Sequence, residues 1–338
     1  MESETVQTVQ KDVNLRPMTM SDFPDVHRLI CEFDLSSIGH AGLSLEDVRD
    51  DWLGRARFEL ERDAIVVTTQ GGEIVGFTAV FEYRDPPVRP FMWGIVAPQY
   101  RGQGIGARLI EWSIDRARKA VPHVPDEARV VLQATAFGAH DFTKHALKRH
   151  GFYYAGSFYA MRITFDAAPE PATFPEGIRL ITYADRPDPR MFAYVYGHSF
   201  ADHRGWLVKW TMEHPLHRVN DMLSWPDTDP NLIFFLMDGD LPVGLLTVHP
   251  SDEDDPDYAN THWLAIMPGY RRQGLARQLL QHAFVTAHAL GKKGLTLNVD
   301  ASSLTNAVRL YESAGMHAKY QWDAYHLELR PGIEYTRQ

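Results

Sequence analysis

Several features that mark other classes of protein are scarce or missing in this chain. Its 338 residues include one cysteine, Cys31, which excludes an intramolecular disulfide and leaves a cysteine metal site without a second thiol. No apolar run approaches the ~20 residues that a membrane-spanning helix needs. The polar stretch 1–11 lacks the apolar segment of a secretion signal. These absences predict a cytoplasmic protein with no membrane partner.

Positive charge is also scarce. Lysine and arginine total 34 against 44 acidic residues, a formal net charge of −10, which argues against a nucleic-acid partner. The histidines lack metal-ligand spacing backed by carboxylates, so no metal is expected. Much of the acidity lies in one segment, 252–257. Two interpretations stay open for it: a solvated loop tip, or a charge that attracts a cationic acceptor.

The most informative feature that is present is a repeated loop. Residues 96–106 read VAPQYRGQGIG, and residues 266–276 read IMPGYRRQGLA in the same order and register. Each copy has a strand end, a proline turn, a Tyr-Arg pair and small residues that open an amphipathic helix. Backbone N–H groups at a helix N-terminus bind anions, and glycine lets a phosphate approach closely. The repeat therefore predicts two phosphate-cradling loops in a duplicated chain.

Two other phosphate-binding loops fit less well. Gly102-x-Gly104-x-x-Ala107 also matches the Rossmann fingerprint. That fold places its glycines directly after the first strand of the unit and an acid at the end of the next strand. Here several expected strands come first, and the strand 130–133 ends without an acid. No Gly-Lys-Ser/Thr follows either loop, which excludes a Walker loop.

The two copies divide the chain into similar halves, since the spacing from Arg101 to Arg271 nearly equals that from Gly151 to Gly315. We expect an N-terminal domain over 1–166, a proline-rich linker over 167–176 and a C-terminal domain over 177–338. The predicted fold class is α/β (α+β): two tandem domains, each a mixed, mostly antiparallel sheet flanked by helices. The expected strands are 13–18, 64–68, 74–83, 91–96, 130–133 and 157–165, then 178–180, 232–237, 242–249, 258–266, 295–299 and 321–329.

With the pattern Arg/Gln-x-x-Gly-x-Gly/Ala present in both loops, the chain resembles the GNAT superfamily of N-acetyltransferases. The resemblance implies that each loop binds the pyrophosphate of acetyl-coenzyme A. It also implies that a splayed central strand pairs with the pantetheine arm. The implied cofactor contacts are Ile95, Val96, Arg101, Gly102, Gln103, Gly104, Ile105 and Gly106 in the first half, and Leu264, Ile266, Arg271, Arg272, Gln273, Gly274, Leu275, Ala276 and Asn306 in the second.

The segment 304–316 looks like the family helix Asn-x-x-Ala-x-x-Leu-Tyr-x-x-x-Gly-Phe. Ala307, Leu310, Tyr311 and Gly315 match, whereas Leu304 stands at the usual Asn and Met316 at the usual Phe. The resemblance makes Tyr311 the general acid that protonates the departing thiolate. A phenol suits this role because its reference pKa of ~10 lies above the ~8.5 of a thiol.

The first half departs from this motif. Counting back from Gly151 as from Gly315 places Leu147 at the position of Tyr311 and Phe142 at that of Asn306. We therefore expect an N-terminal domain that is non-catalytic or only holds acyl-CoA, beside a catalytic C-terminal domain. This division of labour resembles the tandem architecture of mycothiol synthases.

The general base is less evident. Many family members carry a glutamate on the central strand at the positions that are Asn260 and Pro90 here, and neither can take a proton. His262, two residues after Asn260, is expected on the same strand face and is the candidate base. Asp300, Asp323 or a water relay are the alternatives.

The predicted function is acetyl-CoA-dependent N-acetyl transfer to an amine of a small molecule such as an antibiotic, an amino sugar or a biosynthetic intermediate. The resemblance places the acceptor wall in 186–231. Two alternatives stay open: acetylation of a protein lysine or N-terminus, and an acyl-CoA-binding sensor without catalysis. The oligomeric state is undetermined; a monomer is compatible with two domains that pair within one chain.

Overall fold

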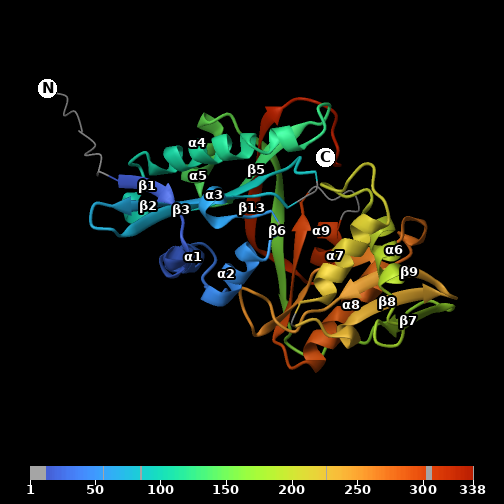
Figure 1. Ribbon diagram of the computed structural model, residues 1–338. Helices are drawn as coiled ribbons and strands as arrows, with labels where there is room; N and C mark the ends of the chain where they lie inside the picture. Colours follow the sequence, from blue (N-terminus) through green and yellow to red (C-terminus); the bar gives the residue numbers. More distant parts are fainter. Residues whose placement is uncertain (1–12, 56, 84–85, 226, 302–306, 338) are drawn as a thin grey trace, which may run out of the picture. The chain divides into compact units, whose positions relative to one another are not determined.

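The computed structural model describes residues 13–337 except 56, 84–85, 226 and 302–306 (Figure 1). Its chain forms two compact units. Unit 1 comprises Met1–Gly156 and Trp322–Ile333, and unit 2 comprises Ser157–Gln321 and Glu334–Gln338. Within the described residues, no helix is long and apolar enough to cross a membrane.

Unit 1 is a mixed sheet with helices packed on it. The strand order is β1-β2-β3-β4-β5-β13; β4 and β5 run parallel and the other neighbours antiparallel. The strands are β1 (Val13–Pro17), β2 (Ala64–Thr69), β3 (Ile74–Phe81), β4 (Phe91–Val96), β5 (Val130–Phe137) and β13 (His317–Arg330). The helices are α1 (Phe23–Ser37), α2 (Leu45–Leu53), α3 (Leu60–Asp63), α4 (Ile105–Arg118) and α5 (Asp141–Arg149).

Unit 2 repeats the plan with its sheet in two parts. One part is antiparallel in the order β7-β8-β9-β11, and the other contains β6, β12 and β10, with β10 parallel to β12. The strands are β6 (Tyr153–Thr164), β7 (Ile178–Thr182), β8 (Ile233–Asp238), β9 (Leu241–Thr247), β10 (Tyr258–Thr261), β11 (Leu264–Ile266) and β12 (Gly294–Asp300). The helices are α6 (Pro189–Phe200), α7 (Glu213–Leu223), α8 (Leu275–Ala289) and α9 (Ala307–Ser313).

The last strand of each half lies in the other unit. β13, from the C-terminal end, pairs with β5 from Trp322↔Phe137 to Arg330↔Val130. β6, from the first half, pairs with β12 from Gly294↔Thr164 to Asp300↔Phe158. The expectation that 157–165 and 321–329 each close the sheet of their own half is therefore wrong. The alternating apolar pattern of a strand specifies a buried face but does not name the neighbour across the ladder.

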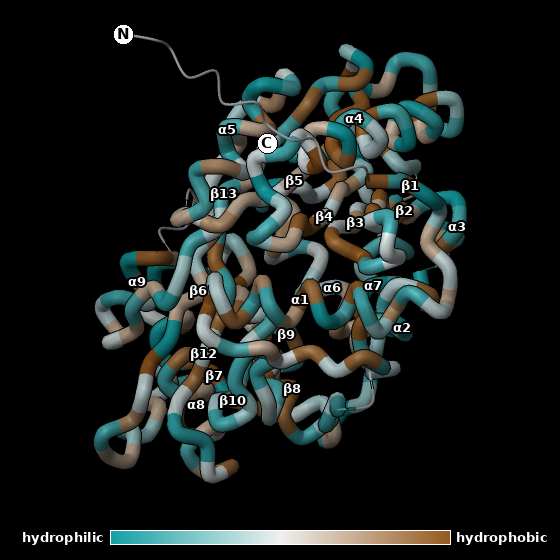
Figure 2. The backbone as a smooth tube through the Cα atoms, turned by 90° about the vertical axis from the view of Figure 1, so that its left-hand side faces the viewer, coloured by the Kyte–Doolittle hydropathy of each residue, from teal (hydrophilic) through white to brown (hydrophobic). Residues whose placement is uncertain are grey.

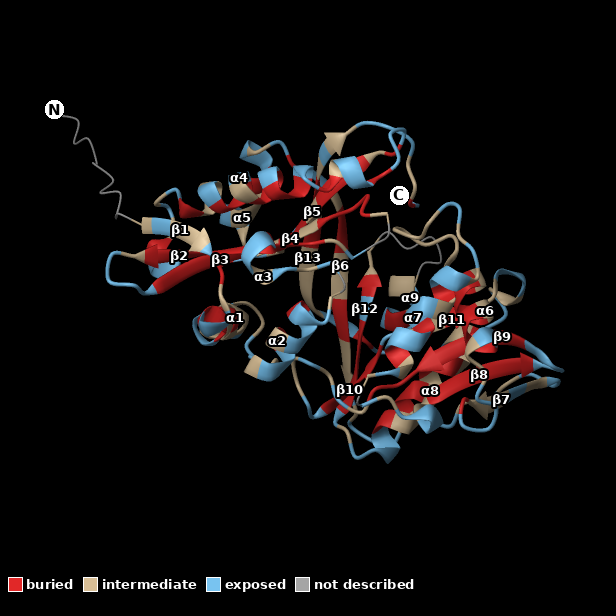
Figure 3. Ribbon diagram, viewed as in Figure 1, coloured by how far each residue is buried: buried red, intermediate tan, exposed pale blue. Residues whose placement is uncertain are grey.

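Burial follows the strand pattern. β3 is buried along its whole length, and β8 is buried from Ile233 to Met237 (Figure 3). These strands are among the apolar segments of the chain (Figure 2). In unit 2, α8 packs Leu279, Leu280 and Ala283 on one face of the sheet. α6 packs Phe192 and Val195 in a separate cluster with β8, β9 and β11. The sheet of unit 2 thus lies between α8 and the α6–α7 pair.

The central strand of unit 2 is interrupted, although one strand over 258–266 was expected. It breaks at His262 and Trp263 into β10 and β11. Ala259, Leu264 and Ile266 pack with the α8 cluster, whereas Trp263 and Ala265 pack with the α6 cluster. Strict alternation would put Trp263 on the side of Ala259. The extra residue is accommodated by two hydrogen bonds, Thr247 N to Trp263 O and Trp263 N to Thr247 Oγ1. Trp263 thereby packs its ring 4.2 Å from that of Tyr196.

Candidate active site

The two repeated loops have nearly the same geometry. Each begins with a 3-10 turn, Pro98–Tyr100 or Pro268–Tyr270, and leads to a helix capped by a left-handed glycine. Gly104 has φ 81° and ψ −8°, and Gly274 has φ 80° and ψ −7°. Neither helix has a side-chain cap. The first N–H groups of α4 and α8 are therefore free of side-chain acceptors, as an anion site at a helix N-terminus requires.

Open space lies over both loops. A Cβ added at Gly102, Gly104, Gly106 or Gly274 would meet no atom within 4 Å. Gly102, Gly104 and Gly274 have positive φ, a backbone conformation that favours glycine. Gly106 has neither a positive φ nor a close neighbour, so the fold itself does not require glycine there. The cradle fits the diphosphate of a nucleotide-type cofactor, which needs room beside backbone donors.

The loop arginines differ in what they contact. Arg101 donates from Nε to Val96 O at 3.2 Å, and Arg271 donates to Ile266 O at the same distance. Arg271 also pairs with Asp202 and donates to Ser199 O at 2.8 Å, so α6 and the residues after it hold its guanidinium. Arg272 is exposed and has φ 62°, the one positive value at a described residue other than glycine. These contacts suit Arg271 to fixing the loop on its strand and leave Arg272 facing solvent.

Next to each loop the central strands separate. β10 and β12 pair from Tyr258↔Gly294 to Thr261↔Leu297, after which β11 pairs with β9 instead. In unit 1, β4 and β5 share the single pair Phe91↔Gln133. Among the residues that the structure describes, the backbone groups beyond these points have no partner strand on that side, so each splay offers donors and acceptors to an extended arm. Ile95, Val96, Leu264 and Ile266 all lie on the diverging ends.

Tyr311 lies on α9, packed in the cluster of α8 and β12 and 7% exposed. Burial raises the pKa of Tyr311 to about 12. Leu147, 2% exposed, occupies the corresponding place on α5. The match is close, since Met316 N donates to Tyr311 O at 3.0 Å and Phe152 N donates to Leu147 O at 3.1 Å. Asn306 lies outside the described residues.

Comparison with known proteins agrees with this geometry. The acetyltransferase (GNAT) family profile matches residues 23–151 and 200–316, one region in each half. The chain belongs to the GNAT acetyltransferase family. It is therefore an enzyme of the acyl-CoA N-acyltransferase class, built from two GNAT regions.

Individual relatives match this chain over most of its length. A mycothiol acetyltransferase of Thermobispora bispora is 29% identical over 72% of this chain and 77% of its own length. Another, of Acidothermus cellulolyticus, is 26% identical over 68% and 69%. The crystal structure of a GCN5-related N-acetyltransferase from Sphaerobacter thermophilus has a TM-score of 0.81 at 26% identity and covers 96% of this chain and 98% of its own.

His262 occupies the break in the central GNAT strand. Its ring lies 4.2 Å from that of His249 and 5.3 Å from that of Trp225. The residue is exposed at the surface, while the protein around its ring and the neighbouring His249 lower the pKa of His262 to about 4. The imidazole is therefore neutral at pH 7, able to accept a hydrogen bond but a weak base.

The alternative bases are engaged elsewhere. Asp300 lies 2.9 Å from Arg204 Nε, and Asp323 lies 2.8 Å from Lys144 Nζ. Asp323 belongs to unit 1, whereas Tyr311 belongs to unit 2. Pro90 precedes β4, and its carbonyl accepts from Gln133 N. No group of three or more metal-ligating side chains occurs within the described part of the chain.

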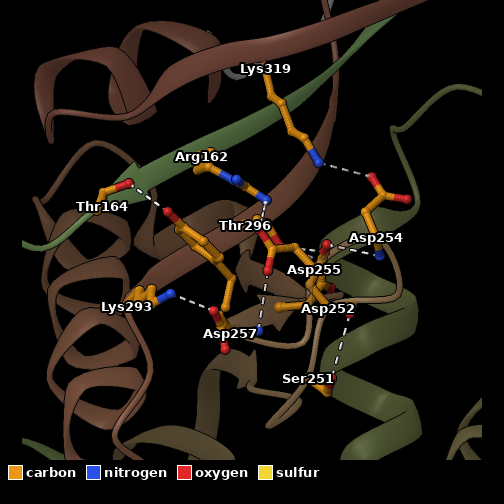
Figure 4. Close-up of polar contacts among 12 residues, drawn as sticks. Arg162, Thr164, Ser251, Asp252, Asp254, Asp255, Asp257, Lys293, Thr296 and Lys319 are labelled. Atoms are coloured by element: carbon orange, nitrogen blue, oxygen red, sulfur yellow. Dashed lines mark hydrogen bonds and ion pairs between the residues drawn. The ribbon is translucent and has the colours of Figure 1, made fainter. Parts of the chain in front are cut away.

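The carboxylates of the acidic segment 252–257 are largely paired, while Glu253 and Asp257 are exposed to solvent (Figure 4). Asp254 pairs with Lys319, Asp255 with Arg162, and Asp257 with Lys293. Asp252 instead accepts from Asn260 Nδ2 at 2.9 Å and from Thr296 Oγ1 at 2.5 Å. The sequence marked Asp252 only as one member of an acidic segment, because Asn260 and Thr296 lie on strands that meet it only in the folded protein.

The region 186–231 contributes packing as well as surface. Phe192 and Tyr196 are buried against Trp263, and Trp206 contacts both Tyr196 and Trp210. These aromatic residues support the α6 face of the broken strand. At the break, the ring of His262 contacts those of His249 and Trp225 in tilted and edge-on arrangements, and His249 lies 3.9 Å from Asp227.

Proposed function

We propose that this GNAT enzyme transfers the acetyl group of acetyl-CoA to a primary amine of a small molecule, at the splay of unit 2. The observation that carries the proposal is the coincidence, in one unit, of an open phosphate cradle, a splayed central strand and a buried tyrosine. Unit 1 has the cradle and the splay but Leu147 in place of the tyrosine. We therefore assign turnover to unit 2 and, at most, acyl-CoA holding to unit 1.

The residues that would hold the cofactor follow from the geometry. The backbone of 272–276 and the N-terminus of α8 suit the diphosphate, and Leu264 to Ile266 suit the pantetheine amides. Acetyl-CoA supplies the activated acyl group. Tyr311 keeps its proton throughout the neutral range because burial raises its pKa to about 12. Its hydroxyl can therefore donate to a sulfur atom on which negative charge develops.

The acceptor class is a compact amine, and the relatives named mycothiol acetyltransferase favour a thiol-bearing or sugar-linked amine among the candidates. The test is thiol release from acetyl-CoA with a panel of glucosamine, S-methylcysteine amide, ethylamine and a lysine-containing peptide. Mass spectrometry should identify the N-acetyl product. Faster turnover of the peptide than of every small amine would contradict the proposed acceptor class.

A further inference from the structure

The break in the central strand has a polar pair directly before it. Asn260 and Thr296 face each other across β10 and β12, and the pair Thr261↔Leu297 is the last before the strands diverge. Ala259 and Leu295 pack in the α8 cluster, so alternation places Asn260 and Thr296 on the face of the sheet away from α8. Both are buried, at 8% and 5% exposure. The face of the splay away from α8 therefore begins at two buried polar side chains.

A carboxylate from the loop between β9 and β10, Asp252, is fixed on this pair. Asp252 Oδ2 accepts from Asn260 Nδ2 and from Thr296 Oγ1, while Asp252 Oδ1 accepts from Asp254 N at 3.1 Å. Asn260 Nδ2 also lies 2.9 Å from Thr296 Oγ1, which closes a three-residue cluster. Neutral donors thus hold the orientation of the carboxylate without neutralising its charge.

Asp252 differs from the other aspartates of its loop in having no cationic partner among the described residues. Asp254, Asp255 and Asp257 each have a lysine or arginine partner (Figure 4). Among the residues that the structure describes, no lysine or arginine pairs with Asp252. His249 and His262, on the same side of the break, both have lowered pKa values, so they add no positive charge at pH 7. A negative charge held at the splay without a cation is suited to an ammonium group.

We propose that Asp252 binds the ammonium group of the acceptor and takes a proton from it. Asn260, at the position where many family members carry a glutamate, has only an amide and cannot take this proton. The inference rests on the proposed function. One proton of R–NH₃⁺ passes to the carboxylate and then to solvent. The amine nitrogen then forms the new C–N bond as the C–S bond of the thioester breaks. Of the two protons left on nitrogen, one stays in the amide, and the loss of the other balances the proton gained by sulfur through Tyr311.

The test compares two amines of similar shape but different charge. At pH 7 ethylamine is an ammonium ion, whereas 2,2,2-trifluoroethylamine is largely neutral. Asp252→Asn keeps an oxygen acceptor for Asn260 and Thr296. It should lower kcat/KM for ethylamine by about 10²-fold, in line with the loss of a general base. For trifluoroethylamine the change should stay within about threefold, because no proton has to be removed before attack.

Asp254→Asn is the matched control, since it makes the same charge change two residues away and loses only the Lys319 and Tyr320 contacts. It should keep both amines near wild-type rates. Equal losses for both amines in Asp252→Asn would overturn the inference, because a structural role affects every acceptor alike.

Saturation-transfer NMR of ethylammonium with the CoA-bound protein separates this inference from the proposed reaction. Loss of ethylammonium binding in Asp252→Asn, together with wild-type protein that releases no thiol with any amine, would support the Asp252 site and contradict the proposed function. If Asp252→Asn bound ethylammonium and turned over as the wild type does, the Asp252 site would be contradicted and the proposed function would stand.

Discussion

At the scale of single residues, the surrounding protein shifts the proton chemistry of the proposed site. Burial raises the pKa of Tyr311 to about 12, above its ordinary value, and the protein around the ring of the surface residue His262, together with His249, lowers the pKa of His262 to about 4. Both shifts favour the neutral form at pH 7. A phenol of high pKa is a weaker acid than a free tyrosine, so in the proposed mechanism Tyr311 would contribute chiefly a hydrogen bond to the leaving sulfur that strengthens as charge develops.

Tyr311→Phe keeps the ring in its cluster and removes the hydroxyl. We expect kcat to fall by roughly 10²-fold, in the range for loss of one positioned proton donor, with acetyl-CoA affinity nearly unchanged. Leu147→Phe in unit 1, at the corresponding helix position, is the control and should leave kcat unaffected. Steady-state kinetics with saturating amine, together with calorimetric binding of acetyl-CoA, measures both. An unchanged kcat in Tyr311→Phe would remove the tyrosine from the mechanism.

The two pKa shifts also predict the pH profile. A group that must be neutral to accept a proton loses function as pH falls through its pKa, so a role for His262 would put the acid limb of kcat/KM near pH 4 rather than 6.5. Tyr311 must keep its proton, so it adds no alkaline limb below about pH 10. His262→Ala should shift the acid limb if the imidazole takes part. An identical profile in that variant would leave His262 as a packing partner of His249 and Trp225.

Arg272 carries a backbone strain that the fold does not explain. Its φ of 62° costs on the order of 1 kcal/mol for a residue with a Cβ, and the first copy has Gly102 at this place with φ 73°. Arg272→Gly should therefore leave the melting temperature equal or higher while weakening acetyl-CoA binding by about tenfold, because the phosphate loses a cation. Arg190→Ala, at the exposed start of α6, serves as a charge-matched control. Stronger acetyl-CoA binding in Arg272→Gly would contradict a phosphate-binding role.

At the scale of elements, a strand, a turn and a helix N-terminus form the proposed phosphate cradle. The arrangement occurs twice, and the glycines before the two helices, Gly104 and Gly274, have nearly the same φ and ψ. The second turn is further fixed by Arg271, which joins the end of β11 to Asp202 and Ser199 beyond the sheet. The strand before the turn can splay because Trp263 and Thr247 keep β11 paired to β9 as β12 departs. Cradle and splay are thus produced by one local arrangement.

A matched pair of substitutions tests which cradle turns over. Gly106 and Ala276 occupy the same place in the first turns of α4 and α8, and a side chain at Gly106 would meet no atom within 4 Å. Glutamate at either site suits the helix N-terminus, so folding should be preserved while phosphate is repelled. Ala276→Glu should abolish turnover. Gly106→Glu should retain most of it and remove at most one calorimetric acetyl-CoA site.

If Gly106→Glu abolished turnover with the fold intact, as judged by circular dichroism, unit 1 would be catalytic or tightly coupled to the catalytic site. The division of labour proposed above would then be wrong.

At the scale of the whole molecule, each compact unit contains a strand from the other half of the chain. Tyr325 of β13 is 2% exposed in a cluster with α4, β5 and α5. Met161 of β6 is 1% exposed in the cluster of α8 and β12. The glycines with positive φ that follow α5 and α9 also lie against the exchanged strands. A Cβ added at Gly151 would lie 3.4 Å from Leu327 of β13, and one added at Gly315 would lie 3.4 Å from Ile163 of β6.

Because the strands are exchanged, a substitution in one half of the sequence should destabilise the unit that is formed mainly by the other half. Tyr325→Ala, near the C-terminus, should destabilise unit 1 by on the order of 3 kcal/mol through lost burial and a cavity. Met161→Ala, in the first half, should destabilise unit 2 by a similar amount. Hydrogen exchange followed by mass spectrometry should show faster exchange in β2 and β3 for the first variant and in β8 and β9 for the second. Loss of protection in β8 and β9 for Tyr325→Ala would contradict the strand assignment.

The sequence by itself determined the elements that local chemistry specifies. The repeated loop, the helix after it, the hairpins and the family were all readable because glycine dihedrals, proline turns and alternating apolar residues act over a few neighbours. Tertiary structure decided what depends on partners distant in the chain. It exchanged β6 and β13, broke the central strand at His262, turned Arg271 toward Asp202 and set Asp252 on Asn260 and Thr296. A strand pattern specifies a face without naming its neighbour, and a polar side chain shows its role only when burial selects its partner.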